Sequence, residues 1–133
     1  MHIFQGIFLF LFGLVLWTLL EYAVHRWLFH GVLSKYHRHH HDAPTVPRPI
    51  PLWALAIPLL AIFWLSTPLG LGVLTGLVIY EAVHVYIHHG VSEHPWLLKL
   101  HARHLEHHRN PHLNYGLTTN IWDRVFKTLK GKA

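Results

Sequence analysis

Residues 23–31 read AVHRWLFHG, and residues 82–90 read AVHVYIHHG. Each copy places two histidines five positions apart, directly before a glycine, and each ends a long apolar run. A segment of the form H-x-x-H-H follows each copy. The same order of apolar helix, histidine pair and H-x-x-H-H therefore occurs twice. This repeat predicts that two halves of the chain supply one histidine-rich centre.

The apolar runs are long enough to enter a bilayer. Residues 3–20 carry no charged side chain, close to the roughly 20 apolar residues that cross a membrane core. Residues 50–80 also carry none, and their middle, WLSTPLGLG at 64–72, has the composition of a turn. We predict an all-α membrane protein with about three transmembrane helices, one single and two in a hairpin. A histidine-rich cap of short helices completes it.

The composition supports a membrane protein of one domain. Only 13% of the 133 residues are charged, against about 25% in soluble domains, and cysteine is absent. Any metal must therefore bind nitrogen or oxygen ligands. The net charge of +5 does not indicate nucleic acid, because the basic residues lie between apolar runs and form no basic face. We expect residues 1–133 to form a single membrane domain that contacts the lipid bilayer.

Charge placement predicts the orientation. All eleven Lys and Arg residues lie outside the first apolar run and the hairpin turn. By the positive-inside rule, the segments that carry them face the cytoplasm. Both histidine-rich regions then share the cytoplasmic face of a multi-pass protein, so they can meet.

Histidine spacing indicates metal binding. Residues three and four apart share a helix face, so each H-x-x-H-H segment can direct three imidazoles at one point, and two segments can enclose two metals. Neutral imidazole suits zinc, iron, copper and nickel, so ligand type alone leaves the metal open.

The two histidine pairs raise a geometric problem. On an α-helix, positions 84 and 88 are about 40° apart, whereas 84 and 89 are about 140° apart. We therefore predict His88 as a ligand, although the repeat aligns His30 with His89. His25 and His30 have the same wide separation. Either the helix breaks near Phe29 and Gly31, or the two imidazoles serve different metals.

The flanking residues carry a family resemblance. The stretches LLEYAVHRWLFH at 19–30, HHDAP at 40–44 and NYGLTTNIWDRVFKT at 114–128 resemble the fatty acid hydroxylase and sterol desaturase superfamily, closest to its fatty acid 2-hydroxylase branch. The likeness covers residues 20–128. It implies that the metal ligands are His25, His30, His37, His40, His41, His84, His88, His104, His107 and His108.

The resemblance also implies a reaction. Such enzymes are di-iron mono-oxygenases, so we expect two iron ions, O2 and an external electron donor, with no catalytic residues beyond the metal ligands. The expected substrate is a fatty acyl chain of a membrane lipid, hydroxylated at C2 in lipid biosynthesis. Zinc can replace iron in purified protein.

The chain looks like a minimal version of the family. We expect no fused cytochrome b5 domain, so a separate cytochrome b5-like or ferredoxin-like protein would supply electrons. A homo-oligomer would be one way to complete the lipid cavity.

Two alternatives remain. One is a sterol or carotenoid hydroxylase or desaturase of the same superfamily, and the other is a membrane metal-binding protein without catalysis. A transporter is disfavoured, because residues 50–80 place no charge near the middle of the membrane.

Two kinds of residue near the expected metal ligands are predicted to contribute: some orient the imidazoles, and others line the substrate entrance. Carboxylates one helical turn from a histidine can accept the outer N–H of a metal-bound imidazole, which predicts that role for Glu21 beside His25 and for Glu81 beside His84. The histidines in excess of the family signature, His89 and His101, are further candidates for this supporting shell. The candidates for the substrate entrance are aromatic: Trp27, Phe29, Tyr86, Trp96 and Tyr115.

Overall fold

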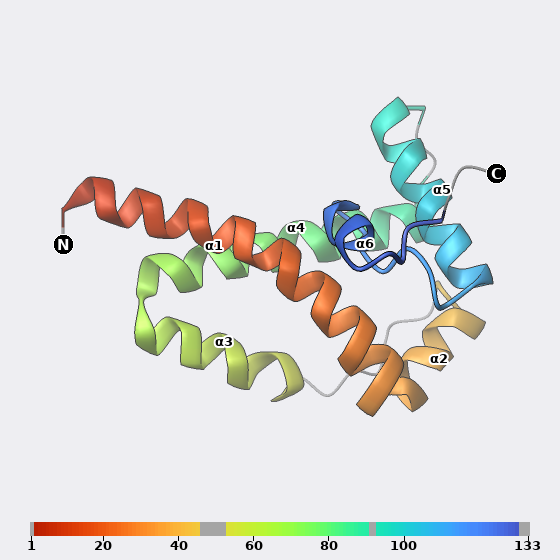
Figure 1. The fold of residues 1–133 in the computed structure, drawn as a ribbon, viewed down its shortest axis with the longest axis horizontal. Helices are drawn as coiled ribbons and strands as arrows, with labels where there is room; N and C mark the ends of the chain where they lie inside the picture. Colours follow the sequence, from red (N-terminus) through yellow and green to blue (C-terminus); the bar gives the residue numbers. More distant parts are fainter. Residues whose placement is uncertain (1, 46–52, 91–92, 131–133) are drawn as a thin grey trace.

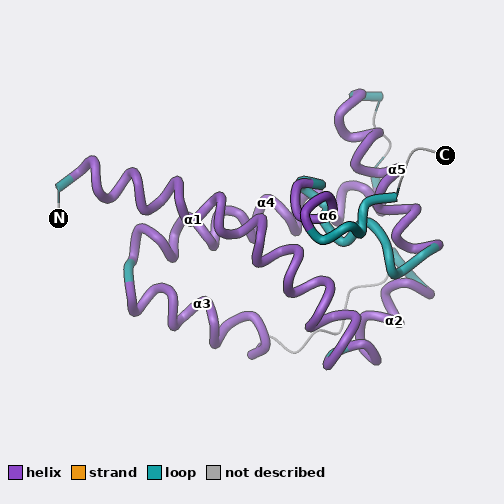
Figure 2. Tube along the Cα trace, in the orientation of Figure 1, coloured by secondary structure: helices purple, strands orange, loops and turns teal. Residues whose placement is uncertain are grey.

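The computed structural model describes residues 2–45, 53–90 and 93–130, and every regular element in these ranges is helical (Figures 1 and 2). The elements are α1 (Ile3–Ala23), the π-helix η1 (Val24–Val32), α2 (Ser34–Asp42), α3 (Trp53–Leu65), α4 (Thr67–His89), α5 (Pro95–Arg109) and α6 (Ile121–Val125). The predicted all-α class is confirmed.

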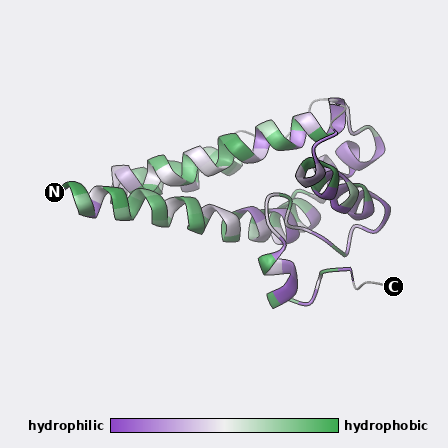
Figure 3. Ribbon diagram, turned by 90° about the horizontal axis from the view of Figure 1, so that it is seen from above, coloured by the Kyte–Doolittle hydropathy of each residue, from purple (hydrophilic) through white to green (hydrophobic). Residues whose placement is uncertain are grey.

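An apolar stalk is formed by α1, α3 and α4. In Figure 1, α1 and α4 run side by side in the same direction, and both end at the part of the molecule that holds α2 and α5. Figure 3 shows the stalk as hydrophobic and the opposite end as mainly hydrophilic. The repeated segments at the ends of α1 and α4 therefore reach the same polar cap, as the repeat predicts.

The stalk contains the three apolar helices that the sequence predicts, and the number of membrane crossings stays a prediction. Two helices are long and apolar enough to cross a membrane: α1 continued through η1, and α4. The third apolar helix, α3, has 13 residues, which is short for a full crossing. The predicted hairpin is confirmed, because α3 and α4 are joined at Ser66, whose side chain accepts a hydrogen bond from Leu69 N. Residues 50–52 of the predicted run lie outside the described residues.

Glycines allow α1 and α4 to pack closely. A Cβ on Gly72 would lie 2.1 Å from the Phe10 carbonyl oxygen, and one on Gly13 would lie 2.5 Å from that of Leu69. One turn further, Gly76 lies under the Trp17 ring, where a Cβ would come within 2.4 Å. Small residues of this kind let membrane helices approach backbone to backbone.

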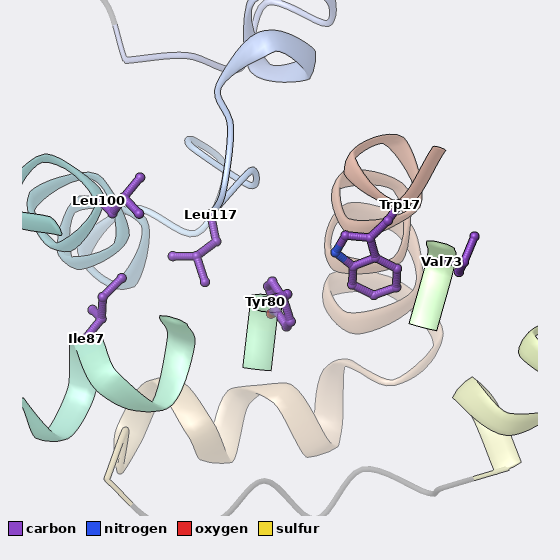
Figure 4. Packing of buried hydrophobic residues seen from close by; sticks show 6 residues of the cluster. All are labelled: Trp17, Val73, Tyr80, Ile87, Leu100 and Leu117. Atoms are coloured by element: carbon purple, nitrogen blue, oxygen red, sulfur yellow. The ribbon is translucent and has the colours of Figure 1, made fainter. Parts of the chain in front are cut away.

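A buried cluster connects the stalk with the cap. Trp17 and Val73 belong to its stalk end, and Leu100 of α5 and Leu117 of the following loop belong to its cap end (Figure 4). Tyr80 lies between them, and its ring meets that of Trp17 edge to face with centroids 5.9 Å apart. The orientation of the cap on the stalk therefore depends on the packing of α1 against α4.

The substitution Gly72→Val tests this packing. The new side chain would collide with the α1 backbone, which cannot move aside as a flexible side chain can. We expect a loss of roughly 1–3 kcal/mol, as for other overpacked sites. Thermal unfolding in detergent micelles measures it, with Val78→Leu on the exposed side of α4 as control. Equal melting temperatures for the two variants would contradict the packing described.

Candidate metal centre

The first repeat is a π-helix. Leu33 N donates to Leu28 O at 2.7 Å, an i to i−5 hydrogen bond, and Gly31 leaves helical geometry with φ −106° and ψ −105°. Because π-helical bonding connects residues five apart, positions i and i+5 lie near one face. The His25 and His30 ring centroids are accordingly 5.1 Å apart. The predicted break occurs at Gly31, but the π-helix before it is what aligns the two rings.

The second repeat is an ordinary α-helix. His84 and His88 are four residues apart on α4, and their ring centroids are 4.7 Å apart. His89 is exposed, whereas His84 is buried. The two near-identical nonapeptides thus present histidines at different spacings, because only the first is π-helical.

Both H-x-x-H-H segments lie on helices. On α2, His37 and His41 bring their Nε2 atoms to 3.2 Å, and on α5 the Nε2 atoms of His104 and His108 are 3.1 Å apart. The remaining histidine of each segment faces the other half of the chain. His40 of α2 approaches His84 with 3.1 Å between Nε2 atoms, and His107 of α5 approaches His30 at 3.0 Å.

Two groups of converging imidazoles result. One contains five residues: His25, His30, His37, His41 and His107. The other contains four: His40, His88, His104 and His108. Within each group the candidate ligand atoms lie within 4.8 Å of one another, and His84 adjoins the second group through His40. The structure therefore brings together all ten histidines predicted as ligands, with each group drawing on both halves of the chain.

The nitrogen spacing fits metal coordination. Two ligands at about 2.1 Å from a metal and at right angles to each other have nitrogens about 3.0 Å apart. The Nε2 contacts within and between helices are 2.9–3.2 Å, for example 3.1 Å between His25 and His37 and 2.9 Å between His88 and His104. All-nitrogen donor sets of this kind suit iron and zinc alike.

The electrostatic environment keeps these rings neutral. Burial lowers the pKa of His107 and of His108 to about 3, and burial together with repulsion from neighbouring imidazoles lowers the pKa of His37 and of His104 well below the usual 6.5. A neutral imidazole offers the lone pair that a metal requires. Protons therefore compete little with a metal at neutral pH.

Backbone carbonyls orient two of the rings. His25 Nδ1 donates to Tyr115 O at 2.6 Å, and His107 Nδ1 donates to Leu113 O at 2.7 Å. With its proton on Nδ1, each ring directs the Nε2 lone pair into the five-histidine group. The loop after α5 thus fixes the tautomer of one ligand candidate from each half.

Two buried carboxylates hold that loop through four consecutive amides. Asp123 accepts from Tyr115 N at 2.8 Å and Gly116 N at 2.9 Å. Glu21 accepts from Leu117 N at 2.5 Å and Thr118 N at 2.9 Å, and it also binds the Thr118 hydroxyl. We call residues 115–118 with these two carboxylates the carboxylate latch.

The surroundings of the latch explain its composition. Arg103 Nη2 donates to Leu117 O at 2.7 Å, which places a positive charge near both carboxylates. A Cβ on Gly116 would lie 2.1 Å from Thr119 O, so only glycine fits there. Sequence reasoning did not identify Asp123 or Arg103. The apolar spacing of the tail indicated a helix, but no pattern showed that its single acidic residue turns inward.

The predicted role of Glu21 therefore needs correction. Its hydrogen bonds go to residues 117 and 118, and the Tyr115 carbonyl, not Glu21, accepts from His25. A carboxylate one turn before a histidine on a helix can point at another segment, and here the returning loop occupies that position. Glu21 supports His25 only through the latch. The role of Glu81, which is half-buried, stays a prediction.

The extra histidines lie outside both groups. His89 is exposed, and His101 borders a small depression beside Tyr86 and Leu97. Neither is among the residues that contact the converging rings. The supporting role of His89 and His101 stays a prediction.

A cleft of about 650 Å³ opens beside the histidines. Trp27 and Tyr115, two of the predicted entrance residues, line it together with His30, His37, His41 and His108. Phe29 does not reach it, because its ring is buried against His37 with centroids 5.3 Å apart. Tyr86 and Trp96 are partly exposed and lie away from this cleft. Of the five predicted entrance residues, Trp27 and Tyr115 therefore lie at this cleft. Which of the five contact a substrate stays a prediction.

Comparison with known proteins identifies the family of this chain. The family model for fatty acid hydroxylases matches residues 10–128. The dihydroceramide fatty acyl 2-hydroxylase FAH2 of Arabidopsis thaliana is 37% identical over 90% of this chain and 60% of its own length. The fatty acid 2-hydroxylase of Homo sapiens is 33% identical over 91% of this chain and 39% of its own. The chain belongs to the fatty acid hydroxylase family.

A solved structure has the same fold. Full-length scs7p, in which only the hydroxylase domain is visible, superposes with a TM-score of 0.78 at 31% identity, covering 98% of this chain and 58% of that one. This chain spans less than two thirds of the length of these relatives. Family membership and the two long apolar helices make it a membrane protein.

Paired substitutions in the second repeat test which histidine binds metal. We expect His88→Ala to lose metal, because its Nε2 faces that of His104, and His89→Ala to retain it. Metal content after iron loading and gel filtration measures both. Loss of metal from His89→Ala with retention in His88→Ala would reverse the assignment.

Substitutions in the carboxylate latch test its support of the ligands. In Asp123→Asn, an amide N–H would face the backbone N–H of residue 115 or 116, at a cost of about 2–3 kcal/mol for a charged hydrogen bond. We expect metal affinity to fall about 10–100-fold, as for other residues that orient ligands. Competition with a chelator measures the affinity, and Glu93→Gln at an exposed site is the control. Unchanged affinity in Asp123→Asn would show that the loop orients no ligand.

Proposed function

We propose that this chain hydroxylates the fatty acyl chain of a membrane lipid, with C2 as the position oxidised, in lipid biosynthesis. The observation that carries the proposal is the pair of histidine groups, which lie side by side at the end of an apolar stalk and open to one cleft. The named activities of the relatives, dihydroceramide fatty acyl 2-hydroxylase and fatty acid 2-hydroxylase, indicate the substrate class.

The proposed cofactor is a pair of iron ions. His25, His30, His37, His41 and His107 would hold one, and His40, His84, His88, His104 and His108 would hold the other. Bound iron would supply the O2-dependent oxidation of an unactivated C–H bond, for which amino-acid side chains have no equivalent.

The chain's own residues limit water around the site. The Phe29 ring stacks on His37, and the Tyr80 ring stacks on His84 with centroids 5.7 Å apart. Both aromatic residues are buried. Their rings cover one side of each histidine group, so that approach from the cleft is favoured. Restricting water in this way protects a reactive centre from side reactions.

Substrate and electrons would arrive from different directions. The exposed apolar surface of α1 and α4 suits a position in the bilayer, where lipid acyl chains are available. The basic residues around the histidine cap favour a cytoplasmic location by the positive-inside rule. A separate cytochrome b5-like or ferredoxin-like protein would deliver electrons there.

Lipid analysis in cells tests the function. We expect a host that lacks 2-hydroxy acyl lipids to accumulate them when it expresses this chain with a suitable reductase system. His107→Ala should lower the product more than about tenfold, since this ligand candidate joins the two halves. His39→Ala, an exposed histidine of α2, is the control. Mass spectrometry identifies the product and the position of the hydroxyl group.

Two results would contradict the proposal. The first is an unchanged lipid profile when the protein holds iron and receives electrons. The second is hydroxylation of a sterol or carotenoid ring in place of an acyl chain.

A further inference from the structure

Arg26 of η1 occupies an aromatic cage at the cleft. Its guanidinium carbon lies 5.6–5.9 Å from four ring centroids, those of Tyr22, Trp27, Tyr115 and Phe126. A guanidinium against aromatic faces is held by cation–π attraction, and it is more weakly hydrated than an ammonium group. The cage therefore fixes a half-buried positive charge in one place.

One hydrogen-bonded chain ties this charge to the carboxylate latch. Arg26 Nη1 donates to Tyr22 OH at 2.7 Å, and the Tyr22 hydroxyl is 2.9 Å from Thr128 Oγ1. Thr128 in turn donates to Asp123 Oδ1 at 2.8 Å. The direction of these bonds makes Tyr22 the acceptor from Arg26 and the donor to Thr128. The hydrogen bond to Tyr22, which is itself held by Thr128 and Asp123, therefore fixes the orientation of the Arg26 guanidinium.

Most of the donors of Arg26 are left for another group. A guanidinium has five N–H groups, and the structure gives Arg26 one hydrogen bond, to Tyr22. Within residues 2–45, 53–90 and 93–130, the ion pair formed by side chains is Lys130 with Glu106, so no carboxylate there neutralises Arg26 directly. A cation held in this state matches an oxygen ligand from outside the chain.

The place of Arg26 in the cleft indicates which ligand. The cleft that it lines is also lined by histidines of both groups, His30, His37 and His41 from one and His108 from the other. The Tyr115 ring, which contacts the guanidinium, also contacts His30 and His107 with centroids 5.4 and 5.5 Å away. A group bound to Arg26 would therefore occupy the same cleft as histidines of both groups, with the Tyr115 ring in contact with the guanidinium and with His30 and His107.

We propose that Arg26 binds the C1 oxygen of the acyl substrate and so selects C2 for oxidation. The inference rests on the proposed function and adds the means of its selectivity. C2 is bonded to C1, so fixing the C1 oxygen beside the histidines holds C2 nearest the reacting centre and leaves the remaining chain to extend away. The ligand chemistry is an acyl oxygen, either the carboxylate of a free fatty acid or the amide carbonyl of an N-acyl lipid.

Binding without turnover tests the site directly. Zinc-loaded protein in detergent micelles would be titrated with hexadecanoic acid, N-hexadecanoyl sphinganine and 1-hexadecanol, which lacks the carbonyl. We expect at least one acyl compound to bind about tenfold or more tightly than the alcohol, as for a hydrogen bond to a charged group. Preference for the acid identifies a carboxylate, and preference for the amide identifies an N-acyl lipid. Equal affinity for all three probes in the wild type would overturn the proposal.

Variants separate binding from packing. Arg26→Gln should lose the discrimination between acyl compound and alcohol, and Arg26→Lys, which keeps the charge, should restore part of it. Arg124→Gln, an exposed arginine outside the cleft, is the matched control. If Arg26→Gln binds metal and still discriminates as the wild type does, the proposal is wrong. If Arg26→Gln fails to fold, the wild-type probe comparison and Arg26→Lys still decide.

Product analysis in the iron-loaded protein gives an independent readout. We expect Arg26→Gln to raise KM for the acyl substrate and to spread hydroxylation from C2 to C3 and beyond while iron content stays unchanged. Unchanged KM together with product only at C2 would contradict the role of Arg26. A wild type that discriminates the probes but forms no hydroxylated lipid would sink the proposed function while leaving the acyl-oxygen site in place.

Discussion

Each imidazole nitrogen can either accept a hydrogen bond with its lone pair or donate one with its N–H, but not both. This limits how the histidines of the cap can interact with one another. His37 Nε2 lies 3.1 Å from His25 Nε2 and 3.2 Å from His41 Nε2, and His104 Nε2 stands in the same relation to His88 and His108. One nitrogen cannot satisfy two such neighbours by a single proton. A divalent cation among the nitrogens can satisfy all of them, which is why burying so many imidazoles is consistent with a stable fold.

The other features of the molecule serve this convergence. The close approach of α1 and α4 at Gly13 and Gly72 brings the two repeats to one end of the stalk. His40, from the first half of the sequence, belongs to the group formed mainly by the second half, and His107 from the second half belongs to the other group. Each group therefore needs both halves of the chain. The carboxylate latch then holds the loop carbonyls that orient His25 and His107. A polar centre at the end of an apolar stalk would suit the proposed oxidation of a lipid that stays in its bilayer.

The sequence predicted the parts of this structure that repeat or follow helical spacing. Hydrophobic patterning predicted the apolar runs and the hairpin turn at Ser66. Helical spacing predicted that His88, and not His89, faces the other histidines. It did not predict the π-helix, because AVHRWLFHG and AVHVYIHHG have nearly the same composition and differ in backbone bonding only once folded. Asp123 was also missed, since its partners at 115 and 116 depend on a tertiary fold of the tail. A side chain that accepts hydrogen bonds from the backbone of a separate loop does not recur at a regular spacing, so hydrophobic or helical periodicity cannot reveal it.

In the proposed enzyme, each of the two interleaved histidine groups would hold a metal ion. Diffraction from crystals of the iron-loaded protein, recorded on both sides of the iron absorption edge, measures this most directly. Two bound iron ions would give two anomalous peaks per chain, one among His25, His30, His37, His41 and His107, and one among His40, His84, His88, His104 and His108. A single peak, or peaks away from these nitrogens in a protein shown to contain iron, would contradict it.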